Sequence, residues 1–227
     1  MTYCRRLTNV RAGDTKTEKW EEKMKLSLYA SKTEDYLTCD EIVDFDNPKI
    51  CSLSQSLFEQ SNGELDFIKR AYEFVRDEIS HSADADKDEV TCSASEVLEA
   101  GHGICFAKSH LLAAILRSRG IPAGFCYQKL ILDDDTAPVL IYHGLNGVYL
   151  KDLDTWVRLD ARGNKPGVNA QFSTEFEQLA FPVRTEKGEI DDLVIYPNPD
   201  KNVLTHLKEG KSRKELWKHL PMELDYK

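Results

Sequence analysis

The feature that most constrains this chain is an apolar helix that begins at a cysteine. Residues 111–116 read LLAAIL, which is apolar on every side of a helix, so we expect this helix to lie buried in the fold. Cys105 stands at the start of this helix, after a glycine-rich turn. The helix is expected to end at Gly120, which is followed by Ile121 and Pro122. Because the N–H groups and the dipole at a helix N-terminus favour an anion, this position predicts a thiol with a lowered pKa.

The length and composition are those of an ordinary globular protein. The chain has 227 residues, of which 41% are hydrophobic and 30% are charged, enough for a substantial core. A net charge of −9 without a basic stripe argues against nucleic-acid binding. No apolar run reaches the roughly 20 residues of a transmembrane helix, so no membrane association is expected. The N-terminal residues carry no hydrophobic signal segment and the six cysteines form no CxxC pair, so we expect a cytoplasmic protein.

Apolar periodicity predicts helices in the first half of the chain and mostly strands in the second. A half-buried strand is expected at 26–28, and helices at 47–58, 65–79, 93–100 and 105–120. Further strands are expected at 125–132, 139–143, 145–150 and 156–160. Helices followed by adjacent strands indicate an α+β fold, in which a helical N-terminal part with the buried cysteine helix packs on an antiparallel β-sheet.

The domain organisation follows from where these patterns begin and end. Residues 1–23 are polar and without a steady period, so we predict a flexible N-terminal extension. Residues 24–227 are predicted to form a single domain. Its last part, about 173–220, is expected to be a helical extension with short helices near 173–179 and 200–219.

Three residues on different predicted elements suggest a catalytic group. Cys105 heads the helix, His143 lies on a strand, and Asp160 ends a later strand. A thiol becomes a good nucleophile when an imidazole takes its proton, and a carboxylate on the other ring nitrogen fixes the ring. The seventeen residues from His143 to Asp160 are the length of a hairpin, so the two side chains can lie together with the helix N-terminus facing them.

Three segments taken together resemble the transglutaminase-like superfamily. GICFAKSHLLAAILRSRGIPAGF resembles its nucleophile segment, HGLNGVYL its histidine strand, and WVRLDARGN its strand ending in aspartate. The resemblance covers about residues 65–165. It implies a papain-like α+β core in which Cys105, His143 and Asp160 form the catalytic triad.

The resemblance also implies a reaction. Cysteine enzymes of this kind attack a carboxamide or peptide carbonyl, form a thioester acyl-enzyme, and pass the acyl group to water or an amine. We therefore expect a peptide or protein substrate with a carboxamide or amide bond, and no metal or organic cofactor.

Many members carry a tryptophan and a glutamate soon after the histidine, whereas residues 144–147 here read GLNG. Protease, deamidase, cross-linker and glycan-removing amidase stay open, as does a catalytically inactive papain-like domain used for binding or scaffolding.

The oxyanion of such a reaction needs hydrogen-bond donors. The backbone N–H of Cys105 is the first candidate, and the side chains of His102 and Gln128 are candidates for the second. Trp156 shares a strand face with Asp160, so we expect it to pack beside the site.

A zinc site is the competing interpretation of the same region. His102, Cys105 and His110, with Cys92 as a fourth ligand, would supply the donors. Their spacing fits no common zinc finger, and His110 falls inside the predicted helix, so no metal site is predicted.

Overall fold

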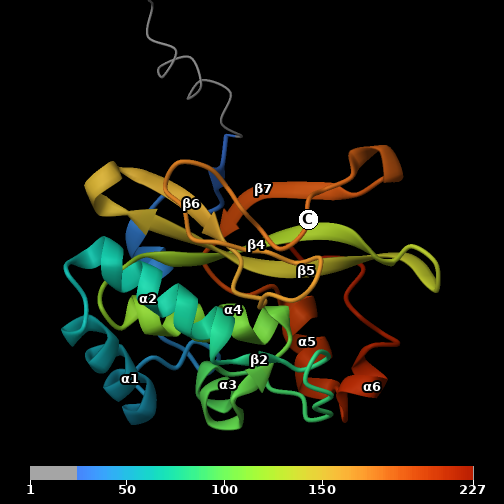
Figure 1. The fold of residues 1–227 in the computed structure, drawn as a ribbon, viewed down its shortest axis with the longest axis horizontal. Helices are drawn as coiled ribbons and strands as arrows, with labels where there is room; N and C mark the ends of the chain where they lie inside the picture. Colours follow the sequence, from blue (N-terminus) through green and yellow to red (C-terminus); the bar gives the residue numbers. More distant parts are fainter. Residues whose placement is uncertain (1–24, 227) are drawn as a thin grey trace, which may run out of the picture.

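The centre of the protein is a mostly antiparallel sheet (Figure 1). The computed structural model describes residues 25–226, so the predicted extension at 1–23 lies outside the described residues. Within this part of the chain the sheet has the strand order β1-β7-β4-β5-β6. The strands are β1 (Ser27–Leu28), β4 (Ala123–Asp133), β5 (Ala137–Leu150), β6 (Thr155–Leu159) and β7 (Ile190–Tyr196). β4 pairs antiparallel with β5 and β7, β6 pairs antiparallel with β5, and β1 runs parallel to β7.

The helices cover one face of this sheet, and α4 lies at their centre (Figure 1). They are α1 (Pro48–Glu59), α2 (Glu64–Asp77), α3 (Ala94–Ala100) and α4 (Cys105–Arg117). α4 packs against the other three and against β4 and β5. All of its residues except Cys105 are buried, which confirms the prediction from the LLAAIL run. The fold is therefore α+β, as expected.

Capping residues set where the helices begin. The side chain of Asn47 accepts from the N–H of Lys49, and Pro48 follows at the first helical position. Ser93 and Glu96 form the predicted capping box of α3. Ile104 at the start of α4, in contrast, makes no side-chain cap hydrogen bond, so the first amides of that helix stay available to another acceptor.

β5 differs from the prediction because it is one continuous strand. The sequence predicted two strands, at 139–143 and 145–150, with Gly144 between them as a turn signal. In the structure Gly144 pairs with Tyr127 inside the strand. A Cβ atom at Gly144 would lie 2.5 Å from Cδ1 of Phe106, so the glycine marks a close approach of α4 to the sheet.

The prediction of a helical extension over about 173–220 is wrong in two places. Residues 173–179 contain no helix, because the Ser173 hydroxyl accepts from the N–H groups of Glu175 and Phe176 and holds a turn. Residues 190–196 form β7, which lies between β1 and β4 and buries Ile195 and Tyr196. Helices occur only later in this segment, in α5 (Lys201–Glu209) and α6 (Arg213–Leu216).

Short elements complete the described chain. β2 (Ser80–His81) and β3 (His102–Gly103) pair in parallel, and single 3₁₀ turns are η2 (Thr33–Leu37), η3 (Lys151–Leu153) and η4 (Thr185–Lys187). Among residues 25–226, no helix has both the length and the apolar character needed to cross a membrane.

Candidate active site

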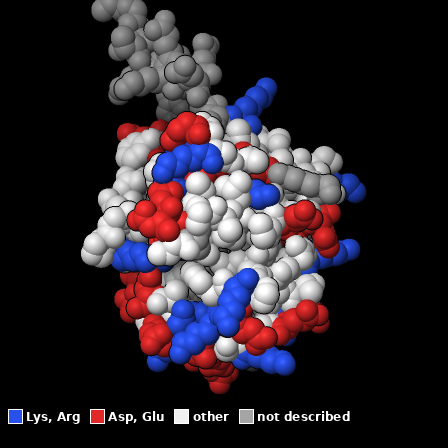
Figure 2. Space-filling model, turned by 90° about the vertical axis from the view of Figure 1, so that its right-hand side faces the viewer, with Lys and Arg blue, Asp and Glu red and all other residues white. Residues whose placement is uncertain are grey.

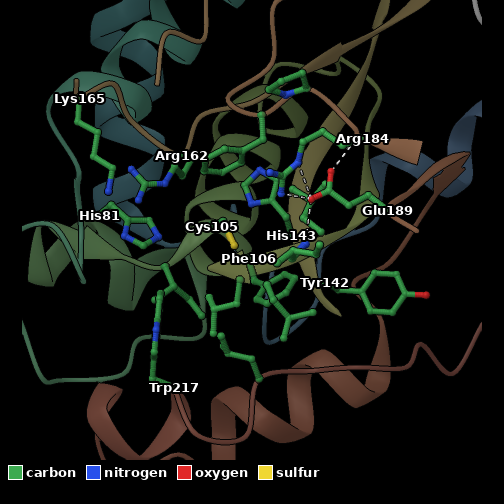
Figure 3. A pocket seen from close by; sticks show the side chains of 18 residues that line it. His81, Cys105, Phe106, Tyr142, His143, Arg162, Lys165, Arg184, Glu189 and Trp217 are labelled. Atoms are coloured by element: carbon green, nitrogen blue, oxygen red, sulfur yellow. Dashed lines mark hydrogen bonds and ion pairs between the residues drawn. The ribbon is translucent and has the colours of Figure 1, made fainter. Parts of the chain in front are cut away.

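A cavity of about 440 Å³ opens at the N-terminus of α4, between β4, β5 and the segment after α6. Cys105 and His143 both line it (Figure 3). Figure 2 shows the side of the molecule on which the β4–β5 hairpin and α6 lie, with uncharged residues in its middle and charged side chains around them. Cys105 is partly exposed, so a molecule in the cavity can reach its sulfur.

Cys105, His143 and Asp160 lie together at this point. Nε2 of His143 is 2.8 Å from Oδ2 of Asp160. The Cys105 thiol lies close enough to the His143 ring and to the backbone of Gly144 for both to lower its pKa. The elements are those expected from the sequence: the first residue of α4, the middle of β5, and the residue after β6.

Asp160 is buried and held on both carboxylate oxygens. Oδ2 accepts from the backbone N–H of Ala180 (3.0 Å) as well as from His143, and Oδ1 accepts from the N–H of Arg162 (3.1 Å). Burial alone would raise the pKa of this carboxyl, but the His143 charge and these hydrogen bonds lower it below its ordinary value. Asp160 is therefore an anion that fixes the His143 ring.

The electrostatics favour a charged cysteine–histidine pair. Burial opposes the thiolate of Cys105, but the charge and hydrogen bond of His143, with the Gly144 N–H, outweigh it and lower the pKa of the thiol. Burial also opposes a charged His143, yet Asp160 and Cys105 raise the pKa of the ring to about 10. The two groups titrate as a pair, and between their pKa values the proton resides on the imidazole.

A buried lysine connects α4 to the loop that carries Asp160. Lys108 lies one turn after Cys105 and is 0% exposed. Its Nζ donates to the backbone carbonyls of Arg76 (3.3 Å), Ile79 and Arg162 (3.0 Å), so each of its three N–H groups has an acceptor. The end of α2, the start of α4 and residues 160–162 are thus held against one another.

Two residues singled out in the sequence as oxyanion donors do not line the cavity. Gln128 does not line it, and its amide nitrogen lies 3.4 Å from Asp191 on β7. His102 is held by the Ser82 hydroxyl (3.1 Å) and also does not line it. Neither side chain is therefore positioned as an oxyanion donor.

Trp156, which we expected to pack beside the site, does not line the cavity. Its ring lies 4.9 Å from that of Tyr36 and 5.6 Å from that of Tyr149, between centroids. It belongs to a small apolar cluster with Tyr36 and Leu145 rather than to the cavity.

The residues of the zinc interpretation are used differently. Nδ1 of His110 lies 2.7 Å from the backbone carbonyl oxygen of Cys92, and its ring packs on Phe125. Within residues 25–226, no group of three or more His, Cys, Asp or Glu side chains is arranged to hold a metal ion.

Several cavity residues were missed in the sequence. His81 stood in a polar loop, Phe181 in an unpatterned segment, and Trp217 in the expected C-terminal helix. In the structure all three line the cavity, and Phe181 packs edge-on against the His143 ring at 5.2 Å. His81 lies in a two-residue strand, which is too short to show any periodicity, so no sequence signal could have found it.

Comparison with known proteins gives one family match, which covers part of the chain. Residues 52–161 match the family model of the transglutaminase-like superfamily. No curated protein matches the chain. A solved structure of a candidate cysteine protease from Cytophaga hutchinsonii is 16% identical, with a TM-score of 0.47, and the match covers 59% of this chain and 43% of that one. The periplasmic domain of TgpA from Pseudomonas aeruginosa is 16% identical, with a TM-score of 0.43, covering 57% of this chain and 46% of the other. The chain therefore matches less than half the length of either structure.

Proposed function

We propose that the protein is a cysteine enzyme that acts on amide or peptide carbonyls, starting from the match of residues 52–161 to the transglutaminase-like superfamily. Members of the superfamily are generally cysteine-dependent enzymes. In this proposal Cys105 is the nucleophile, His143 the base and acid, and Asp160 the residue that orients His143. The substrate is a peptide or protein with a carboxamide or amide bond.

The reaction has two halves. The Cys105 thiolate attacks the carbonyl carbon, a C–S bond forms, and the π electrons of the carbonyl move to its oxygen. His143 then gives its proton to the leaving nitrogen as the C–N bond breaks, which leaves a thioester on Cys105. Water or a second amine, deprotonated by His143, takes the acyl group and frees the thiol. Asp160 stabilises the imidazolium in both halves.

The observation that carries this proposal is that Cys105 and His143 line the same cavity, with the His143 ring hydrogen-bonded to the buried Asp160 carboxylate (2.8 Å). A binding or scaffolding domain without catalysis has no need of a thiol with a lowered pKa beside an accessible cavity. The geometry therefore favours the enzyme over the inactive module.

Thiol labelling tests the proposal directly. Iodoacetamide at neutral pH should alkylate Cys105 in a fast phase, because the lowered pKa of this thiol increases its thiolate fraction. Burial raises the pKa of Cys92 to about 11 and raises that of Cys126 further. The Cys105→Ala variant should lose the fast phase, and p-nitrophenyl acetate should acetylate Cys105 in the native protein, as read by peptide mass spectrometry.

Cys51 provides the matched control, because it is exposed and lies outside the cavity. The Cys51→Ala variant should keep the fast phase. Equal labelling of native protein and Cys105→Ala, or an unmodified Cys105 after treatment with the ester, would contradict the proposal.

A further inference from the structure

The cavity has two chemically different sides. One side is built by five residues that we call the apolar wall: Leu132, Ile141, Tyr142, Trp217 and Leu220. All five are in, or pack against, the main hydrophobic core. In Figure 3 the labelled charged residues lie on one side of Cys105 and Trp217 lies on the opposite side.

The apolar wall is fixed in place by the chain that follows α6. The backbone N–H of Tyr142 on β5 donates to the carbonyl of Pro221 at 2.9 Å, which fastens this chain to the sheet. Leu220 is buried, whereas Leu132, Ile141 and Trp217 are half-buried and keep apolar surface open to the cavity.

The charged side chains of the cavity form ion pairs within the protein. Asp84 lies 2.5 Å from Nη1 of Arg162 and 2.7 Å from Nζ of Lys165. Arg184 is paired with Glu189 (2.5 Å) and Asp134 (2.6 Å). Because each of these charges already has a partner, an acidic or basic substrate side chain would have to compete with an existing ion pair.

We propose that the apolar wall binds a large aliphatic or aromatic side chain next to the carbonyl that Cys105 attacks. The inference rests on the proposed function and narrows its substrate class. Burying such a side chain releases water from apolar surface on both partners, whereas a charged or amide side chain would lose its hydrogen bonds to water without gaining new ones. A cavity of about 440 Å³ is large enough for one such side chain beside the reacting group.

Acylation by activated esters tests this selectivity. The substrates are the p-nitrophenyl esters of N-acetyl-phenylalanine, N-acetyl-leucine, N-acetyl-glycine and N-acetyl-aspartate. For each ester we measure the rate of p-nitrophenolate release and the rate of acyl transfer to Cys105. The phenylalanine and leucine esters should acylate the native protein roughly 10- to 100-fold faster than the glycine ester, relative to their reactivity with free cysteine. Trp217→Ala and Ile141→Ala should reduce this preference, and Lys218→Ala, next in sequence and exposed, should keep it.

The outcomes separate the two proposals. Equal corrected rates for the four esters, or an unchanged preference in both wall variants, would overturn the apolar subsite while Cys105 still becomes acylated. If no ester acylates Cys105, the proposed function itself fails, and the subsite fails with it.

An independent observation concerns His81, the unexpected histidine of the cavity. β2 pairs in parallel with β3 so that His81 lies opposite Gly103, and the N–H of Ser82 donates to the Gly103 carbonyl at 3.1 Å. Gly103 is two residues before Cys105, so this pairing fixes the histidine beside the nucleophile. Figure 3 shows the Cys105 sulfur between the side chains of His81 and His143.

The His81 ring has hydrogen-bonding capacity that the protein leaves unused. It is 6% exposed, and its Nδ1 has no hydrogen-bond partner among the described residues. Its described ring contact is edge-on with Trp217 at 6.5 Å. Burial, and next the charge of Arg162, lower the pKa of the ring to about 3, so at neutral pH it is uncharged and carries one N–H. A buried unpartnered imidazole on a cavity wall is suited to bind a polar atom of a ligand.

We infer that His81 donates a hydrogen bond to the oxyanion that forms when Cys105 attacks the carbonyl, as the second donor beside the Cys105 backbone N–H. This inference also rests on the proposed function. His81 keeps its proton throughout: the C–S bond forms, the π electrons of the carbonyl move to its oxygen, and the proton for the leaving group comes from His143. The ring acts as a fixed dipole aimed at developing charge.

Comparing acylation with alkylation tests His81 specifically. Acylation of Cys105 by p-nitrophenyl acetate passes through an oxyanion, whereas displacement of iodide from iodoacetamide does not. His81→Ala should slow acetylation by about 10²- to 10³-fold, the usual effect of removing an oxyanion donor, and leave the alkylation rate within about twofold. His81→Gln, whose amide also donates, should recover part of the loss.

His219→Ala, an exposed histidine outside the cavity, should leave both rates unchanged. A parallel loss of both rates in His81→Ala would mean that the histidine only supports the Cys105 environment, and unchanged acetylation would remove it from the reaction. Absence of acetylation in the native protein would instead reject the proposed function and His81's role together.

Discussion

At the scale of single residues, the reactivity of Cys105 depends on which neighbour outweighs burial. A thiol at a helix N-terminus already benefits from the helix dipole, but burial in the cavity wall acts in the opposite direction. His143 outweighs burial and lowers the pKa of Cys105, chiefly through its positive charge. Asp160 stabilises that charge by raising the pKa of His143. The lowered pKa of Cys105 is therefore a property of the pair and not of the helix alone.

A pH profile should reveal this dependence. The thiolate forms as pH rises through the lowered pKa of Cys105, and the His143 proton is lost only near pH 10, so native alkylation should reach its plateau well below the pH needed for a free thiol. In His143→Ala the favourable charge is gone and burial remains, so the midpoint should move up by at least about one pH unit, a tenfold lower rate at neutral pH. Stopped-flow measurement with iodoacetamide from pH 5 to 10 checks this, and an unmoved midpoint would assign the low pKa to the helix instead.

At the scale of elements, α4 is positioned by Lys108 as much as by its apolar faces. Its ammonium joins the carbonyls of Arg76 and Ile79, at the end of α2, to that of Arg162, in the loop after β6. An apolar residue of the same length would keep the packing but leave three buried carbonyls without a donor.

Lys108→Met should therefore lower the free energy of unfolding by on the order of 3 kcal/mol, as measured by urea denaturation. Lys69→Met is the control, because Lys69 is exposed and only pairs with Glu73 one turn along α2. That surface pair should contribute less than about 1 kcal/mol. Similar losses in both variants would show that the three carbonyls do not depend on Lys108.

Also at this scale, the sequence identified the elements that carry a clear local pattern and missed those that do not. The helices with repeated apolar spacing and clear caps were predicted within a few residues, because each carries its signal locally. The sequence predicted a turn at Gly144. The glycine is required there because the Phe106 ring packs against the strand, and Phe106 belongs to a helix that is distant in sequence. β2 and β3, two residues each, have no pattern to detect, and they are what positions His81.

At the scale of the whole molecule, the sequence predicted the α+β class and the grouping of Cys105, His143 and Asp160, and it missed what surrounds them. β7 reads IDDLVIY, in which two acidic residues obscure the strand pattern until pairing with β4 explains it. The apolar wall draws on β4, β5 and the chain after α6, so it exists only once these segments meet. The group of Cys105, His143 and Asp160 was visible in local motifs, and the apolar wall was not.

The position of β7 has a consequence for how the protein is made. β7 lies between β1 and β4, and the Tyr36 hydroxyl donates to the carbonyl of Ile195, 159 residues further along the chain. During synthesis, β4, β5 and β6 leave the ribosome first, and one edge of β4 has no strand to pair with until β7 follows. An unpaired edge of this kind can bind the strands of other chains. The interval between translation of β4 and of β7 is therefore when the nascent chain is most exposed to aggregation.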